Sequence, residues 1–258
     1  MEKIVLIGAG NVATHLGIAL QKSGHDVMQV YSRTEESARA LADKLGCRFT
    51  TSIAEVLPDA TLYIVSVKDD ALASLLPQLT ARNADALFVH TAGSVSIDVW
   101  SGLTRRYGVL YPMQTFSKQR EVDFGQIPCF VESNSEEDVQ LLKDIASALS
   151  EKVYEASSEQ RKSLHLAAVF TCNFTNHMYV LAAELLKKYG LPFEAMLPLI
   201  DETARKVHEL EPLAAQTGPA VRYDENVIDE HLRMLADEPQ MLELYREISE
   251  NIHRLAIR

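Results

Sequence analysis

Two glycines near the start of the chain have a spacing that directly implies chemistry. The stretch "IVLIGAGNVATHL" passes from four apolar residues into Gly8, Gly10 and Ala13, and then into a helical pattern. Gly8 permits a tight turn, Gly10 leaves room for a pyrophosphate, and Ala13 lets the helix pack on the strand. Because the N-terminal end of a helix attracts phosphates, the stretch predicts dinucleotide binding; a strand–helix turn without ligand is the alternative. The predicted phosphate cradle comprises Gly8, Gly10, Asn11, Val12 and Ala13.

The residues after the second expected strand indicate which dinucleotide is bound. NAD-binding units usually carry Asp or Glu at that strand end, where the carboxylate holds the ribose 2′-hydroxyl. Here the position is Tyr31, and Ser32, Arg33 and Thr34 follow it. Two hydroxyls and a guanidinium suit a 2′-phosphate. The sequence therefore predicts NADP, the alternative being that Arg33 is a solvated surface residue.

Two further segments follow expected strands and add candidates to the same cleft. "SVKDDA" supplies Ser66 and Val67, and "HTAGS" supplies His90 and Thr91. Open α/β sheets bind ligands at the carboxyl ends of their parallel strands, so these residues are expected at the cofactor. His90 is a candidate for proton transfer, or a histidine whose hydrogen bonds are satisfied at a strand end.

Alternating strand and helix patterns must position these residues. Such alternation over residues 1–156 predicts a doubly wound, mostly parallel sheet of the Rossmann type within an α/β fold. A helix is expected at Ser135–Leu149, opened by a capping box of Ser135 and Asp138. The expected strands are Lys3–Ile7, Asp26–Tyr31, Cys47–Thr50, Thr61–Val65, Ala86–His90, Gly108–Tyr111, Pro128–Val131 and Lys152–Glu155.

Residues 157–258 predict a separate all-α domain, because strand patterns stop near Ala156. A long helical stretch opens with "SSEQ", a capping box from Ser157 to Gln160, and runs to Tyr189. Further helices are expected at Phe193–Leu210, at Asp224–Ala236, and from Pro239 to near the end.

Composition excludes several classes of protein. With a net charge of -11 and no Lys/Arg run longer than two, neither nucleic acid nor an anionic membrane is expected as a partner. No apolar run approaches membrane-spanning length, and no signal-peptide pattern is present. Three dispersed cysteines fit reduced thiols and a cytoplasmic location. The eight histidines form no HxH or HExxH pattern, so no metal is expected.

Several motifs together resemble a known family. "GAGNVATHL", "YSRT", "IVSVKDDAL" and "HTAGSV" are similar to the NADP-binding domain of pyrroline-5-carboxylate reductases and of deazaflavin (coenzyme F-420)-dependent NADP oxidoreductases. "GVLYPMQTFS" and "QTGPAVRYDENVI" resemble an uncharacterised bacterial family that joins this domain to a helical domain of unknown function. The resemblance implies a helical domain like the C-terminal part of 6-phosphogluconate dehydrogenase. It also implies a homodimer formed through those helices, with the substrate between the nicotinamide and the long helix.

The resemblance suggests catalytic candidates and also departs from known mechanisms. Tyr111 stands where prephenate dehydrogenases carry a substrate-contacting histidine, so its hydroxyl is a candidate proton donor, with simple packing as the alternative. On the long helix, spacing of 3.6 residues places His165, Cys172, Asn173 and Asn176 on roughly one face. The Lys–Asn pair of related hydroxyacid dehydrogenases is absent, so their mechanism does not transfer. His165 and Asn173 are candidate substrate contacts, or hydrogen-bonding partners of neighbouring helices.

A last candidate lies at a break between the C-terminal helices. Gly218 and Pro219 interrupt the helical pattern, and Arg222 follows in "TGPAVRYD". Arg222 is predicted to clamp a substrate carboxylate, the alternative being an ion pair with Asp224. The sequence thus predicts an NADP-dependent oxidoreductase that acts on a small, carboxylate-bearing metabolite. The alternatives are an NADP-binding sensor or scaffold without turnover, and an enzyme that reduces a deazaflavin.

Overall fold

The computed structural model describes residues 1–257 and divides into two compact units. The first is Met1–Cys172 and the second is Asn173–Arg258. Ala156, the predicted domain boundary, lies between the last strand and the first helix of the C-terminal region. That boundary stays a prediction, and the two units are described separately below.

An eight-stranded sheet forms the centre of the first unit, in the order β3-β2-β1-β4-β5-β6-β7-β8. All pairs are parallel except β6 with β7, so the predicted α/β class with a mostly parallel sheet is confirmed. All predicted strands are present, with ends that shift by one or two residues. Their bounds are β1 Lys3–Ile7, β2 Asp26–Tyr31, β3 Arg48–Thr50, β4 Leu62–Val65, β5 Leu87–His90, β6 Arg106–Pro112, β7 Cys129–Ser133 and β8 Val153–Glu155.

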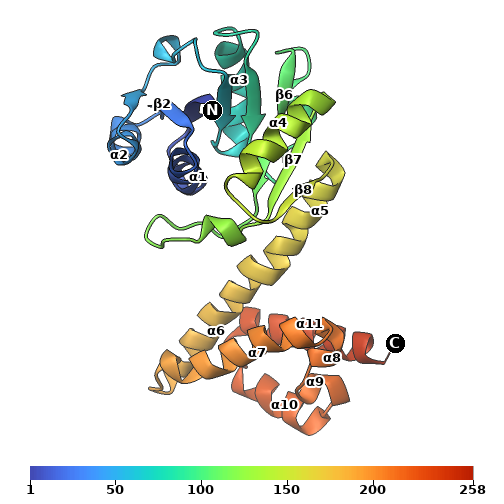
Figure 1. Cartoon of the computed structure of the whole chain (residues 1–258). Helices are drawn as coiled ribbons and strands as arrows, with labels where there is room; N and C mark the ends of the chain where they lie inside the picture. Colours follow the sequence, from blue (N-terminus) through green and yellow to red (C-terminus); the bar gives the residue numbers. More distant parts are fainter. Residues whose placement is uncertain (258) are drawn as a thin grey trace. The chain divides into compact units, whose positions relative to one another are not determined.

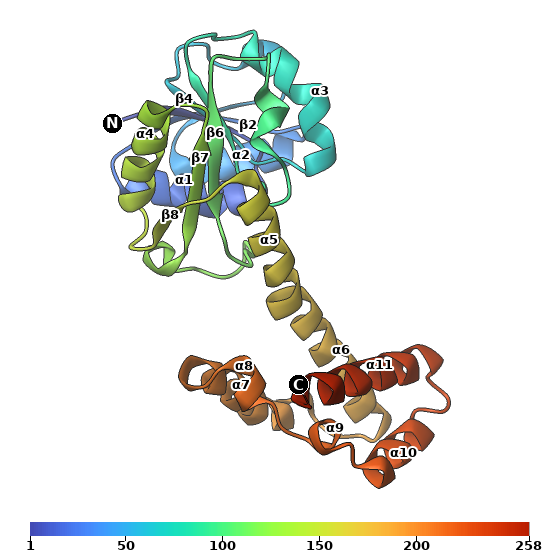
Figure 2. The same cartoon turned by 90° about the vertical axis from the view of Figure 1, so that its right-hand side faces the viewer.

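Helices cover both faces of the sheet, as the apolar strands "LYIV" and "LFVH" require. One face packs on α1 (Asn11–Lys22), α2 (Glu35–Leu45) and α4 (Glu136–Ser147). The other packs on α3 (Asp69–Thr80) and on Trp100 of the short helix η2 (Ile97–Trp100). Figure 2 shows α3 and α4 on opposite sides of the strands. The short 3-10 helices η1 (Ile53–Glu55) and η3 (Phe124–Gln126) complete the connections.

The register of the parallel strands puts five residues in one row across the sheet. Ile7 pairs with Tyr31 on one side and Val65 on the other; Val65 pairs with His90, and His90 with Val109. Residues that follow this row therefore emerge along a single edge of the sheet. In this way the fold gathers segments that are far apart in the sequence at one ligand-binding edge.

The long helical stretch is continuous but not uniform. It comprises α5 (Ser158–Ala168), a π-helical segment η4 (Val169–Phe174) and α6 (Thr175–Lys188). The predicted capping box at Ser157 and Gln160 is present. A π-helix has a wider turn than an α-helix, so the 3.6-residue spacing that grouped His165 with Asn173 is interrupted at this segment.

The second unit is entirely helical (Figure 1). The predicted helices from Phe193, Asp224 and Pro239 are present, and Asp224 caps its helix by accepting a hydrogen bond from the N–H of Val227. Two short helices between them were not predicted. After α6 the helices are η5 Phe193–Met196, α7 Leu197–Glu209, α8 Pro212–Ala215, α9 Pro219–Arg222, α10 Glu225–Met234 and α11 Pro239–Ala256.

No helix within residues 1–257 is both long and apolar enough to cross a membrane.

Candidate active site

The phosphate cradle is built from the turn between β1 and α1. Gly8 has φ +116°, and a Cβ there would lie 2.3 Å from the carbonyl oxygen of Ser66, so only glycine fits. Gly10 is the N-cap of α1, and a Cβ on it would meet nothing within 4 Å. The first turn of α1 contains no acidic residue, and no side chain caps it. Its N–H groups are therefore available to an anion, and the open space beside Gly10 suits a pyrophosphate.

A cleft of about 900 Å³ opens from this cradle. Its walls come from the ends of β1, β2 and β4 and from one face of α3. Eight of the residues predicted to bind the cofactor line it: Gly8, Gly10, Asn11, Ser32, Arg33, Thr34, Ser66 and Val67. The predicted cofactor residues are thus brought together by the strand ends.

Arg33 lies at the end of the cleft formed by β2 and α2. Its side chain is exposed and forms no salt bridge with any residue in the described part of the chain. Thr34 is the N-cap of α2, and its side chain makes no capping hydrogen bond. A guanidinium and two hydroxyls are therefore available where the adenosine ribose of a dinucleotide is held.

The edge of the sheet continues from the cleft to a pair of polar side chains. Thr91 donates a hydrogen bond from Oγ1 to Ser66 Oγ at 3.0 Å, which ties the end of β5 to the cleft. Two residues farther on, a Cβ at Gly93 would lie 2.8 Å from Tyr111 Cζ and 3.0 Å from His165 Nδ1. The backbone at Gly93 thus contacts both side chains closely.

Tyr111 and His165 face one another at this edge. Tyr111 Oη lies 3.5 Å from His165 Nδ1, at the outer limit of a hydrogen bond. Burial raises the pKa of Tyr111, against the opposing influence of the Arg161 guanidinium. The phenol therefore keeps its proton at neutral pH, and this proton can be donated to a ligand.

A buried ion pair fixes α5 to the sheet next to this pair. The Arg161 side chain is fully buried and donates to Val95 O at 2.9 Å and to Glu132 Oε2 at 3.0 Å. Glu132 also accepts hydrogen bonds from the backbone and side chain of Ser158. Since Arg161 joins α5, β7 and the loop after β5, it determines where His165 lies relative to Tyr111.

His90 lies beneath the edge and not on it. Its ring is completely buried, stacks at 6.3 Å on Trp100, and accepts a hydrogen bond at Nδ1 from the N–H of Ala92. Burial and then the positive Arg161 lower its pKa to about 3, while the backbone at Ser96 opposes the shift. His90 is therefore neutral at ordinary pH. Its Nδ1 has a hydrogen-bond partner, but its Nε2 is buried without one in the described part of the chain, so the ring is only partly satisfied.

Comparisons with known proteins agree with the predicted fold and with NADP as the cofactor. Residues 3–93 match the family model "NADP oxidoreductase coenzyme F420-dependent", and residues 127–252 match "Domain of unknown function (DUF2520)". The structure is similar to that of the putative NADP oxidoreductase BF3122 from Bacteroides fragilis, with 66% identity, a TM-score of 0.95, and 98% of both chains covered.

The chain belongs to this family of NADP oxidoreductases.

More distant structures share the fold of the oxidoreductase. Protein TM1727 from Thermotoga maritima is 24% identical over 99% of this chain and 100% of its own, with a TM-score of 0.82. An imine reductase from Myxococcus stipitatus, in complex with NADP+, is 18% identical over 98% of this chain and 92% of its own, with a TM-score of 0.67. No curated protein sequence matches the chain.

The remaining predicted residues lie apart from the cleft lining. Ala13 is fully buried, where it lets α1 pack on the sheet, and Val12 is half-buried on the same helix. Asn173 is exposed in the π-helical segment, and Arg222 is exposed at the end of α9 in the second unit. Within residues 1–257 Arg222 forms no salt bridge, so the alternative pairing with Asp224 is not observed.

Some residues at the site were missed by the sequence analysis. Lys68 and Lys118 line the cleft, Gly93 contacts the Tyr111–His165 pair, and Arg161 anchors α5. The glycine in "HTAGS" was a usable signal for Gly93. No local pattern marks Lys118, which reaches the cleft only through tertiary contacts.

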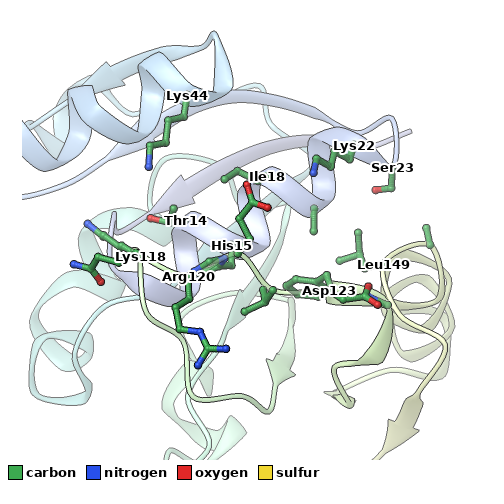
Figure 3. A pocket seen from close by; sticks show the side chains of 17 residues that line it. Thr14, His15, Ile18, Lys22, Ser23, Lys44, Lys118, Arg120, Asp123 and Leu149 are labelled. Atoms are coloured by element: carbon green, nitrogen blue, oxygen red, sulfur yellow. The ribbon is translucent and has the colours of Figure 1, made fainter. Parts of the chain in front are cut away.

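A second cavity, of about 550 Å³, lies on the other side of α1. Figure 3 shows Lys22, Lys44, Lys118 and Arg120 around the part of α1 that carries His15 and Ile18. Lys118 lines both this cavity and the cleft beside Gly8 and Gly10. In the described part of the chain, no group of three or more His, Cys, Asp and Glu side chains is placed to hold a metal ion.

Proposed function

We propose that the protein transfers a hydride between NADP(H) and a small, carboxylate-bearing carbonyl or imine compound. The observation that carries the proposal is the single sheet edge that runs from the Gly8–Gly10 cradle through Ser66 and Thr91 to Tyr111 and His165. The fold is shared with an imine reductase and with 1-pyrroline-5-carboxylate reductase from Streptococcus pyogenes. Imines and pyrrolines both contain a C=N bond, so a compound of this kind is a candidate substrate.

NADP would be held by the cleft residues in two groups. The N–H groups at the start of α1 would bind the pyrophosphate, and Ser32, Arg33 and Thr34 would bind the 2′-phosphate. When bound, the cofactor supplies a hydride, and the protein supplies orientation and a proton. Ser66, Val67 and Thr91 border the next part of the edge and would orient the nicotinamide end toward Tyr111.

Tyr111 is the proposed proton donor. Its phenol holds a proton at neutral pH, and His165 Nδ1 is close enough to receive the hydrogen bond that orients it. A proton given from Tyr111 Oη to the oxygen or nitrogen of the reduced bond would leave a phenolate. Solvent would return a proton to this phenolate by way of His165, which is half-buried. His90, being buried, would act only by positioning the loop that carries Thr91 and Gly93.

Two residues of the second unit are further candidates for binding the substrate. Asn173 and Arg222 carry exposed polar side chains. The Arg222 guanidinium forms no salt bridge with any of residues 1–257, and a guanidinium suits a carboxylate. We propose both as substrate contacts. This part of the proposal rests on the hydrogen-bonding capacity of the Asn173 amide and on the positive charge of the Arg222 guanidinium.

The cofactor assignment is tested by comparing dissociation constants for NADPH and NADH. Replacing Arg33 by alanine is expected to weaken NADPH binding by roughly ten- to hundredfold, because it removes a charge-assisted hydrogen bond. NADH lacks the 2′-phosphate and should bind almost unchanged. Arg39→Ala is a matched control, since Arg39 lies on α2, pairs with Glu35 and does not line the cleft. Equal weakening of both cofactors by Arg33→Ala would contradict the assignment.

Turnover is tested by following NADPH absorbance with a panel of small keto acids, cyclic imines bearing a carboxylate, and a deazaflavin. Oxidation by a keto acid or an imine supports the proposal. Oxidation by the deazaflavin alone favours that coenzyme as the acceptor. NADPH binding without any turnover would contradict the proposed reaction and favour a sensor or scaffold that binds NADP.

We also propose that the protein is a homodimer formed through the second unit. Within residues 173–257 only four residues are buried: Ala220, Ile228, Leu235 and Ser249. Large apolar side chains lie exposed instead, including Leu197, Leu199 and Val207 on α7 and Ile248 on α11. So much exposed apolar surface is typical of an interface.

Sedimentation at micromolar concentration is expected to give twice the chain mass of 28.8 kDa. Leu199→Asp should shift the protein toward the monomer, because Leu199 is 62% exposed and would carry a charge into the interface. Tyr154→Asp is the control, since Tyr154 is exposed in the first unit. A monomeric wild type would refute the dimer.

A further inference from the structure

An irregular segment after β6 is held against the first turn of α1. This strap, residues 113–123, connects β6 to η3 and has the sequence "MQTFSKQREVD". The strap is longer than the median connection of roughly four to six residues, and loops often carry binding residues. Its position is fixed by side chains of α1, which is the helix that carries the phosphate cradle.

Three contacts hold the strap in place. Asn11 Nδ2 donates to Phe116 O at 2.8 Å, and His15 Nε2 donates to Ser117 O at 2.9 Å. The His15 ring also stacks on the Phe116 ring, with centroids 5.2 Å apart. Phe116 in turn packs on the hydrophobic core and lies 6.2 Å from the ring of Phe124. The two residues that precede Lys118 are therefore anchored to α1.

This anchoring brings Lys118 into the wall of the cofactor cleft. Lys118 lines the cleft together with Gly10, Asn11 and Arg33. The residue is exposed, and its ammonium forms no salt bridge with any residue of the described chain. Figure 3 shows Lys118 and Arg120 on the strap beside His15.

The charge of the cleft differs from that of the whole protein. The chain has a net charge of -11, yet the charged residues of the cleft wall are three cations, Arg33, Lys68 and Lys118, and one acid, Asp70. A concave wall with excess positive charge attracts anionic ligands. Lysine provides a compact point charge that suits a phosphate without demanding a fixed geometry.

We infer that Lys118 binds a phosphate of the dinucleotide, which makes the strap part of the cofactor site. The inference rests on the proposed use of the cleft for NADP. Lys118 could bind either the pyrophosphate, which Gly10 and Asn11 would hold, or the 2′-phosphate, which Arg33 would hold. Binding measurements with NADPH and NADH distinguish them, since only NADPH carries the 2′-phosphate.

The test measures dissociation constants of NADPH and NADH for wild type, Lys118→Ala and Lys118→Glu at low and high salt. Lys118→Ala is expected to weaken NADPH binding roughly five- to tenfold at low salt, and Lys118→Glu more strongly. The loss should shrink at high salt, because the contact is exposed to screening. Arg120→Ala is the matched control. Arg120 lies on the same strap and lines the second cavity, but it does not line the cofactor cleft.

Each outcome has a definite reading. Weakening of both cofactors by Lys118→Ala assigns the contact to the pyrophosphate, and weakening of NADPH alone assigns it to the 2′-phosphate. If neither cofactor is affected, or if Arg120→Ala has an equal effect, the inference is overturned. If wild type binds neither cofactor, the proposed function itself fails. Unchanged circular dichroism in each variant confirms that the protein remains folded.

Discussion

Replacing Gly10 by valine is expected to abolish measurable NADPH binding while the protein stays folded. Gly10 has φ −78° and ψ −169°, which valine adopts readily, and its Cβ position meets no atom within 4 Å. The new side chain therefore occupies the space left for the pyrophosphate and displaces it from the N–H groups of α1. We expect the dissociation constant for NADPH to rise at least about a hundredfold, a loss of roughly 2.7 kcal/mol.

Gly8→Ala provides the contrasting control for this experiment. A Cβ at Gly8 would lie 2.3 Å from the Ser66 carbonyl oxygen, and φ is +116°, so the turn between β1 and α1 must distort. This variant is expected to lose thermal stability as well as cofactor binding, whereas Gly10→Val loses binding alone. Wild-type affinity for NADPH in Gly10→Val would exclude the cradle as the pyrophosphate site.

Removing the Tyr111 hydroxyl is expected to have the largest effect on turnover. With a compound that supports NADPH oxidation, Tyr111→Phe should lower kcat by about a hundredfold or more, the usual range for loss of a general acid. The NADPH dissociation constant should remain unchanged, because Tyr111 does not line the cofactor cleft. Steady-state kinetics and cofactor titration on the same preparation separate these two quantities.

Two comparisons make this result specific. Tyr154→Phe removes the same hydroxyl from an exposed tyrosine of β8 and should leave kcat unchanged. His165→Ala should lower kcat less than Tyr111→Phe, because it removes the partner that orients the phenol but leaves the phenol itself. A kcat for Tyr111→Phe within a factor of about two of wild type would assign Tyr111 to packing.

The sheet and the grouping of residues in the cleft at its edge could be predicted because their signals are local. Buried parallel strands are short apolar runs between turns, and each strand end exposes the next few residues at the same edge. Ser32, Ser66 and Thr91 follow strands that pair in register, so naming the strands was enough to group them. Gly8 was recognisable from the sequence because the turn accepts only glycine there: a side chain at Gly8 would collide with Ser66.

Other features depend on tertiary contacts, and no local sequence pattern predicts them. Arg161 reads as a surface residue of an amphipathic helix, yet it is fully buried against Glu132 and Val95. Lys118 joins the cleft because Phe116 and Ser117 are held by residues 105 and 102 positions earlier in the chain. The π-helical segment at Val169–Phe174 likewise follows no 3.6-residue pattern, so the spacing argument for Asn173 could not anticipate it.

The single tryptophan, Trp100, which stacks on His90, gives the protein an intrinsic optical reporter. Trp100 is the only tryptophan of the chain, and it lies fully buried beside the strand whose end leads to Thr91. A reduced nicotinamide absorbs in the near ultraviolet, where tryptophan emits, so excitation energy can pass from Trp100 to a cofactor bound in the same unit. A fall in emission from this one indole on addition of NADPH would therefore report binding without a label, and the sequence contains no second tryptophan.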